Sequence, residues 1–177
     1  MAAESGFTIG SMALKLGIVL MLVLANGFFV AAEFALVATR RSRIDQMAAE
    51  GDKGARRVQR ALKDLDRYIS ATQLGITLAS LALGWLGEEA VATLLDSAFQ
   101  TVGLTVPVIA LHSTSAVIVA FAIITFLHIV LGELAPKSVA LIKPESVSKL
   151  VVRPLVAFSV AMTPFIWAEL KENPVRA

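Results

Sequence analysis

The sequence lacks cysteine and is poor in charge: none of its 177 residues is Cys, and only 17% are Asp, Glu, Lys or Arg. The absence of Cys excludes a disulfide framework, a thiolate metal site and cysteine catalysis. A soluble domain carries about 25% charged residues, whereas here 56% of the residues are hydrophobic. We therefore predict a single all-α membrane domain over residues 1–177, in which oxygen or imidazole must hold any metal.

Catalytic and nucleotide-binding motifs are absent as well. The sequence contains no Walker-type phosphate loop, dinucleotide fingerprint, HExxH or GxSxG element. The two histidines, His112 and His128, would lie about 24 Å apart along one helix, which excludes a shared zinc site. We expect a protein that is not an enzyme.

The basic residues divide the chain into two kinds of segment. Lys and Arg are missing from residues 68–136, whereas nine of the sixteen lie within 40–67 and six follow Pro136. Positive charge concentrates on the cytoplasmic side of membrane proteins. We therefore predict spans at about 12–38, 68–99 and 112–135, with a cytoplasmic helical hairpin at 40–67. The N-terminus is then outside and the C-terminus cytoplasmic, in a multi-pass protein of the inner (plasma) membrane.

Nucleic-acid binding is not expected of residues 40–67, because five acidic residues interleave with the nine basic ones. After Pro136, basic residues recur at 143, 149 and 153, and prolines at 144, 154 and 164. This pattern favours interfacial helices over 137–168, lying along the headgroups of the lipid bilayer, over a fourth crossing by residues 154–168.

Polar side chains inside the spans are the functional candidates, because each is costly in lipid. Asn26 and Glu33 are seven residues apart and share one face of the first span. Gly27 would let another backbone approach that face closely. The alternative is that Asn26 makes only an interhelical hydrogen bond and that Glu33 lies near the headgroups.

The second span carries a polar stripe at spacings of three and four residues, together with Gly75 and Gly84. Hydroxyl residues in membrane helices also serve packing, so the stripe supports either a polar pathway or tight helix contact. Its members are Ser70, Gln73, Thr77 and Ser80.

The third span ends in the sequence Gly-Glu-Leu-Ala-Pro-Lys at residues 132–137, after His128. Pro136 cannot donate to the carbonyl of Gly132, so we expect a kink at Pro136 and Lys137 with a backbone oxygen left free beside the carboxylate of Glu133. The alternative is a simple helix stop with Glu133 and Lys137 as an ion pair. These amide, hydroxyl, carbonyl and carboxylate oxygens suit Mg²⁺ or Ca²⁺, although composition does not separate them from Na⁺.

Three stretches carry a family resemblance: residues 25–37, residues 73–80 and residues 132–137. Over about residues 12–167 the chain resembles the transmembrane domain of the CorC / cyclin M (CNNM) family, long described as hemolysin C-like. The resemblance implies a homodimer with three membrane helices per subunit and a juxtamembrane belt helix. It also implies Mg²⁺ efflux, with Na⁺ as the coupling ion, and cytoplasmic CBS domains in the full-length protein.

The resemblance further implies a set of metal ligands. They are the side chains of Asn26, Ser70 and Glu133, with the main-chain carbonyls of Ile129 and Gly132. Glu33, Gln73, Thr77, Ser80 and His128 are candidates for the rest of the pathway.

The sequence departs from the family pattern at two places. Asn26 stands where Ser is often found, and residues 75–80 read Gly-Ile-Thr-Leu-Ala-Ser in place of Gly-Asn-x-x-x-Asn. Both changes keep oxygen donors but alter the size of the site, so the transported species stays open. The alternatives to Mg²⁺ transport are polyamine export, or a membrane anchor and dimerisation module for cytoplasmic regulatory domains.

Overall fold

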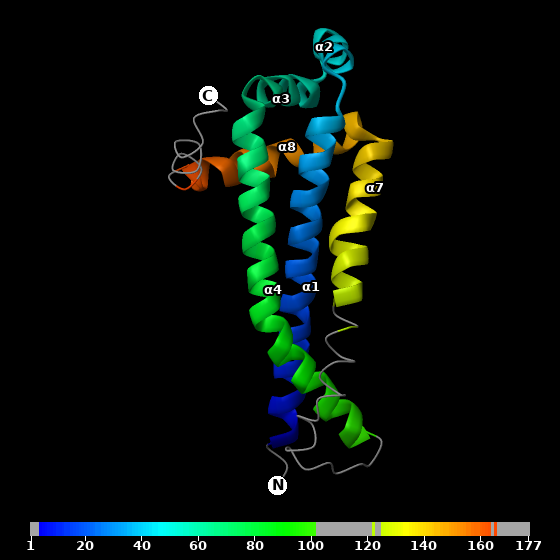
Figure 1. Cartoon of the computed structure of the whole chain (residues 1–177), viewed down its shortest axis with the longest axis vertical. Coiled ribbons are helices and arrows are strands. Elements are labelled where there is room, and N and C mark those ends of the chain that lie inside the picture. Colours follow the sequence, from blue (N-terminus) through cyan, green and yellow to red (C-terminus); the bar gives the residue numbers. More distant parts are fainter. Residues whose placement is uncertain (1–3, 102–121, 123–124, 164, 166–177) are drawn as a thin grey trace.

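The structure is a computed structural model that describes residues 4–101, 122, 125–163 and 165. In this part of the chain every element is a helix and no strand occurs (Figure 1). The elements are α1 (Glu4–Ala38), α2 (Arg41–Ala49), α3 (Lys53–Ala61), the 3₁₀ turn η1 (Leu62–Asp64), α4 (Leu65–Thr101), the π-helix η2 (His128–Leu134), α7 (Ala135–Ile142) and α8 (Pro144–Ala161).

Within the described residues, three helical segments are long and apolar enough to cross a membrane, which confirms the predicted all-α membrane fold. They cover Ala13–Ala38, Lys53–Gly87 and Thr125–Ile142. Residues 102–121 and 123–124, with the predicted external connection and the first part of the third span, lie outside the described residues.

The central span is α1, which packs against α4 on one side and against η2 and α7 on the other (Figure 1). Side chains on two faces of α1 therefore meet both other spans. This arrangement places Asn26, in the middle of the bundle, within reach of both.

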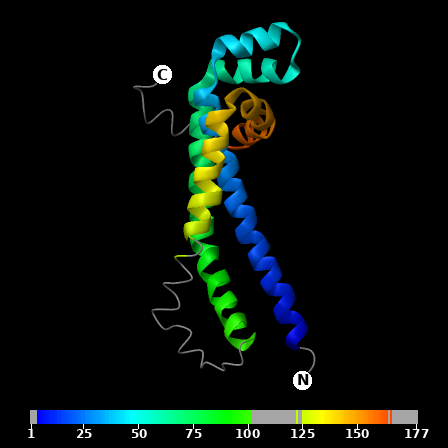
Figure 2. The same ribbon diagram turned by 90° about the vertical axis from the view of Figure 1, so that its right-hand side faces the viewer.

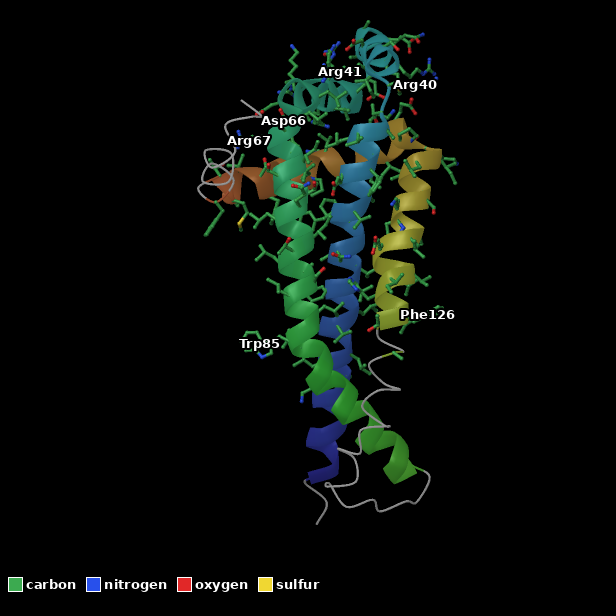
Figure 3. All side chains as sticks on the ribbon, viewed as in Figure 1. Arg40, Arg41, Asp66, Arg67, Trp85 and Phe126 are labelled. Atoms are coloured by element: carbon green, nitrogen blue, oxygen red, sulfur yellow. The ribbon has the colours of Figure 1, made fainter. Side chains whose placement is uncertain are left out.

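One stretch of α4, from Arg67 to Trp85, is about as long as the hydrocarbon core of a bilayer is thick. Arg67 and Trp85 lie on this helix (Figure 3), and their separation corresponds to about 27 Å at 1.5 Å per residue. A hydrocarbon core is about 30 Å thick, and Trp residues concentrate at its edges. The Trp85 side chain is 85% exposed, as an interfacial anchor requires.

The predicted helical hairpin is formed by α2 and α3. Gly51 joins them with φ of +99°, a conformation that glycine adopts without the steric cost other residues pay. Asp52 caps α3, since its Oδ1 accepts hydrogen bonds from the N–H groups of Gly54 (2.7 Å) and Ala55 (3.0 Å).

The main buried apolar cluster lies where the hairpin, the spans and α8 meet. We call this the hairpin end of the bundle. Figure 2 shows α8 nearly end-on beneath the hairpin, so α8 runs across the spans rather than alongside them. Its apolar face packs against α1, α3 and α4. Buried members of the cluster include Leu36, Ile44, Val58, Val152 and Leu155.

An aromatic contact joins α1, α4 and α8 within this end. The ring of Phe29 lies 4.7 Å from that of Phe158, centroid to centroid. A Cβ on Gly75 would stand only 2.5 Å from the Phe29 ring, so only glycine leaves room for it. Gly75 therefore serves packing within one protomer, whereas a Cβ on Gly84 would have no atom within 4 Å.

Two ion pairs connect the hairpin region with α8. Lys149 Nζ lies 2.7 Å from Asp52 Oδ2, and Arg40 Nε lies 3.3 Å from Glu145 Oε1. The hydrogen bond from Lys149, together with those from the backbone of Ala55 and Gly54, holds the pKa of Asp52 below its ordinary value.

The depressed pKa of Asp52 predicts a dependence of stability on pH. The contribution is present above the unfolded-state pKa of about 3.9 and is lost as the pH falls through the lower folded-state pKa. Below about pH 4, the melting temperature of the unmodified chain should fall more steeply than that of Lys149→Met, which keeps the Asp52 cap but not the ion pair. Thermal unfolding in detergent from acidic to neutral pH measures this.

Lys143→Met is the matched control, because the exposed Lys143 forms no ion pair in the part of the chain that the structure describes. Its pH profile should follow that of the unmodified chain. Equal profiles for all three proteins would show that the Lys149–Asp52 pair does not contribute.

Candidate functional site

Asn26 is the centre of the candidate site. Its side chain, only 3% exposed, lies between the other two spans. The Nδ2 group donates a hydrogen bond to the carbonyl oxygen of Gly132 at 3.0 Å, and Oδ1 accepts one from Ser80 Oγ at 3.4 Å. The bond to Gly132 has ordinary geometry, whereas 3.4 Å is long for a hydroxyl donor. Oδ1 is thus held loosely and keeps capacity for a further partner.

Gly27 and Gly132 each leave room for a neighbouring group at this point. A Cβ on Gly27 would lie 2.9 Å from Pro136 Cγ and 3.2 Å from the carbonyl oxygen of Leu131. A Cβ on Gly132 would lie 2.9 Å from the imidazole Cδ2 of His128. The predicted close approach at Gly27 is present, and it brings backbone oxygens against the centre of α1.

The helix just before Pro136 departs from α geometry. Residues His128–Leu134 form a π-helix, in which Ala135 N–H donates to the carbonyl of Val130, five residues back. Because Pro136 has no N–H, it offers no donor to Leu131 in this register or to Gly132 in the α register. The Gly132 oxygen is not left free as predicted, since the amide of Asn26 occupies it.

Glu133 and Lys137 do not pair with each other. The ammonium of Lys137 lies over the ring of Phe34, 4.4 Å from its centroid, in a cation–π contact. The Glu133 side chain is exposed on the protomer and makes no ion pair among the described residues. The simple helix stop with a Glu133–Lys137 pair is therefore not what the structure shows.

The polar stripe on α4 separates into different environments. Ser70 is buried, but it lies ten residues before Ser80, which is about 15 Å along the helix. Gln73 and Thr77 are exposed, and the Thr77 hydroxyl bonds to the Gln73 carbonyl at 2.9 Å. Within the protomer, Ser80 therefore lies close to the Asn26–Gly132 contact, whereas Ser70 lies further along the axis of α4.

The remaining candidates surround this centre at different distances. Glu33 is half-buried two helical turns from Asn26, about 10 Å along α1. The Ile129 side chain is 41% exposed. The imidazole of His128 packs against Gly132, and its Nε2 atom is buried with no hydrogen-bond partner among the described residues.

The groups around Asn26 that could bind a cation include few acidic side chains. Within the described residues, no three His, Asp or Glu side chains come together as a metal cluster. A cation here would depend on amide, hydroxyl and carbonyl oxygens beside one carboxylate. Such neutral oxygen donors fit hard divalent ions.

The chain is similar in sequence to known proteins over most of its length. Residues 16–170 match the family described as cyclin M transmembrane N-terminal domain. The chain is 50% identical to the UPF0053 protein YhdT of Bacillus subtilis over 147 residues, 83% of this chain and 31% of YhdT. It is 50% identical to YhdP of the same organism over 150 residues, 85% of this chain and 33% of YhdP. The chain therefore spans about a third of the length of these relatives.

Removal of the Asn26 amide should destabilise the bundle. Asn26→Leu leaves the Gly132 carbonyl without its donor, and polar contacts between membrane helices contribute about 0.6–2 kcal/mol. Ser80→Ala removes only the long 3.4 Å contact and should cost less. Thermal unfolding in detergent measures the order. A Ser80→Ala variant less stable than Asn26→Leu would contradict the assignment of Asn26 as the connecting residue.

Proposed function

Because the chain belongs to the cyclin M transmembrane-domain family, we propose that it moves divalent cations, Mg²⁺ first, across the membrane. The observation that carries the proposal is the buried hydrogen bond between the Asn26 amide and the Gly132 carbonyl. Efflux, with Na⁺ as the coupling ion, is the direction that we propose. An anchor module would need no buried amide at this depth, where polar groups are costly.

The hydrogen bond supports transport because its two groups can exchange partners. Without a cation, Asn26 Nδ2 satisfies the Gly132 oxygen. Rotation of the amide would present Oδ1 in its place, so that Oδ1 and the Gly132 oxygen both face a cation. Both states then keep the buried polar groups satisfied, as a low-dielectric interior requires.

Glu133 supplies the negative charge in this proposal. It follows Gly132 directly in the sequence, and charge compensation is needed to strip water from Mg²⁺ in lipid. Ser70 lies further along α4 than the Asn26 contact. We propose that it contacts the cation at another point of the pathway rather than together with Asn26.

A carboxylate exposed to lipid is unfavourable, so we propose that a second copy of the chain covers this polar surface. On α4, the exposed Gln73, Thr77 and Gly84 recur at spacings of four and seven residues, which places them on one helical face. A homodimer along this face of α4 would remove Gln73 and Thr77 from lipid.

We propose the orientation from the basic residues, with the hairpin end in the cytoplasm and the N-terminus outside. The inner membrane is the proposed location. The relatives are about three times longer than the matched region, and we propose that their remaining length includes cytoplasmic CBS modules that regulate transport.

Glu133→Gln keeps the shape of the side chain and removes its charge. Mg²⁺ affinity, measured by isothermal titration of the chain in detergent, should fall more than tenfold, about 1.4 kcal/mol or more. Glu33→Gln, the matched carboxylate on α1, should retain most of the affinity. Unchanged Mg²⁺ binding in a folded Glu133→Gln variant would overturn the site, and no Mg²⁺ binding by the unmodified chain would overturn the proposed function.

The proposed dimer face is tested at Gly84. Gly84→Leu adds a bulky side chain where the protomer has no atom within 4 Å, so it should shift dimer to monomer without unfolding the chain. Gly17→Leu, at an equally open position on α1, should leave the mass unchanged. Light scattering in detergent gives the result, and a dimer that is unaffected by Gly84→Leu would exclude this face.

A further inference from the structure

Both ends of α8 are attached to residues at the ends of the spans. Near its start, Glu145 accepts a hydrogen bond at 3.3 Å from Arg40, which follows α1 closely in the chain. Just after its end, the Thr163 hydroxyl accepts one at 3.1 Å from Arg67, in the first turn of α4. The 18 residues of α8 therefore run across the end of the bundle where Arg40 and Arg67 lie (Figure 1, Figure 3).

The side of α8 that faces away from the protein is mostly apolar. Its residues recur at alternating spacings of four and three, which places them on one helical face, and none of them is acidic. Leu150 is 77% exposed and Val160 is 62% exposed. This surface, which we call the outer face of α8, consists of Ser146, Leu150, Arg153, Ala157 and Val160. A transverse helix with such a face fits the boundary between lipid headgroups and acyl chains.

Three basic side chains along α8 have no acidic partner in the part of the chain that the structure describes. They are Lys143, Arg153 and Arg67. Arg67 uses one of its five N–H donors for the neutral hydroxyl of Thr163. The one carboxylate on α8, Glu145, already pairs with Arg40. The surface along α8 therefore carries positive charge that an anionic partner would complement.

The spacing of these basic groups indicates what kind of anion fits. Arg153 lies ten residues after Lys143 and ten before Thr163, the partner of Arg67, which is about 15 Å in each direction. One small anion such as free phosphate cannot bridge these separations. Leu150 and Val160 lie between the basic positions, so a matching surface must alternate anionic and apolar contacts. Phospholipids provide both, because long basic side chains reach headgroups while aliphatic ones remain among acyl chains.

We propose that the outer face of α8 is a binding surface for anionic phospholipids. Leu150 and Val160 enter the acyl region, and Lys143, Arg153 and Arg67 bind the phosphates of separate headgroups. An anionic lipid is preferred to a zwitterionic one, since each basic residue near an anionic surface contributes about 1 kcal/mol. This inference concerns the lipid and not the transported ion, so it does not depend on the proposed function.

Competition between two lipids with the same acyl chains tests the preference. The chain is purified in detergent and mixed with equal amounts of phosphatidylglycerol and phosphatidylcholine, and native mass spectrometry counts the lipids that stay bound. The unmodified chain should retain phosphatidylglycerol at least tenfold more. Arg153→Gln should lower this ratio about fivefold, which corresponds to about 1 kcal/mol.

Arg43→Gln is the matched control, because it removes the same charge from an exposed position on α2. Helix α2 lies at the far end of the hairpin from the spans (Figure 1, Figure 2), so the ratio should stay that of the unmodified chain. Equal retention of both lipids by the unmodified chain would overturn the inference. So would a ratio that Arg153→Gln leaves unchanged or that Arg43→Gln lowers as much.

A spin label on the outer face identifies what covers it. The chain has no Cys, so Leu150→Cys and Ser42→Cys each accept one nitroxide, in bilayers of the same two lipids. The label at position 150 should collide more with oxygen, which concentrates among acyl chains, than with a water-soluble nickel chelate. The label at position 42, on α2, should show the reverse. A label at position 150 that prefers the chelate, or one shielded from both and broadened by a second label, would overturn the inference.

Discussion

The arrangement of the three spans depends on one buried amide. Lipid provides no hydrophobic drive between helices, so contacts must come from close packing and from polar groups that have no better partner. Residues 26 and 27 provide both kinds of contact. Gly27 lets the backbone of η2 pack closely against α1, and the side-chain amide of Asn26 forms hydrogen bonds with Gly132 and Ser80. The same groups that hold the spans together are the oxygen donors of the proposed site. Structure and ligand binding therefore compete for one set of atoms.

Packing at the hairpin end of the bundle stabilises the helices that meet at Asn26. The apolar cluster there is shared by the hairpin, α8 and the ends of two spans, and the Lys149–Asp52 pair joins α3 to α8. Phe29 lies one helical turn from Asn26 and contacts Phe158 on α8. A displacement of α8 would thus reach the Asn26 contact through a short series of packed side chains on α1.

The sequence was sufficient for the spans, the hairpin and the transverse α8, because charge placement and apolar length decide these features in lipid. It also identified Asn26 and Gly27. It did not predict the π-helix, since the choice between α and π registers around Pro136 depends on contacts with α1. The cation–π contact of Lys137 with Phe34 and the intraprotomer role of Gly75 likewise depend on tertiary neighbours. The family resemblance placed Ser70 with Asn26, whereas on α4 it is Ser80, ten residues later, that contacts Asn26.

We propose that a cation replaces the hydrogen bond between Asn26 and Gly132. Solid-state dipolar recoupling can follow it, with ¹⁵N in the asparagine amide and ¹³C in the glycine carbonyls. An Asn173→Gln background leaves Asn26 as the single asparagine. The coupling between Asn26 Nδ2 and the Gly132 carbonyl should be present without Mg²⁺ and lost at saturating Mg²⁺, but retained in Glu133→Gln. A coupling that persists unchanged when Mg²⁺ is bound to the unmodified chain would contradict it.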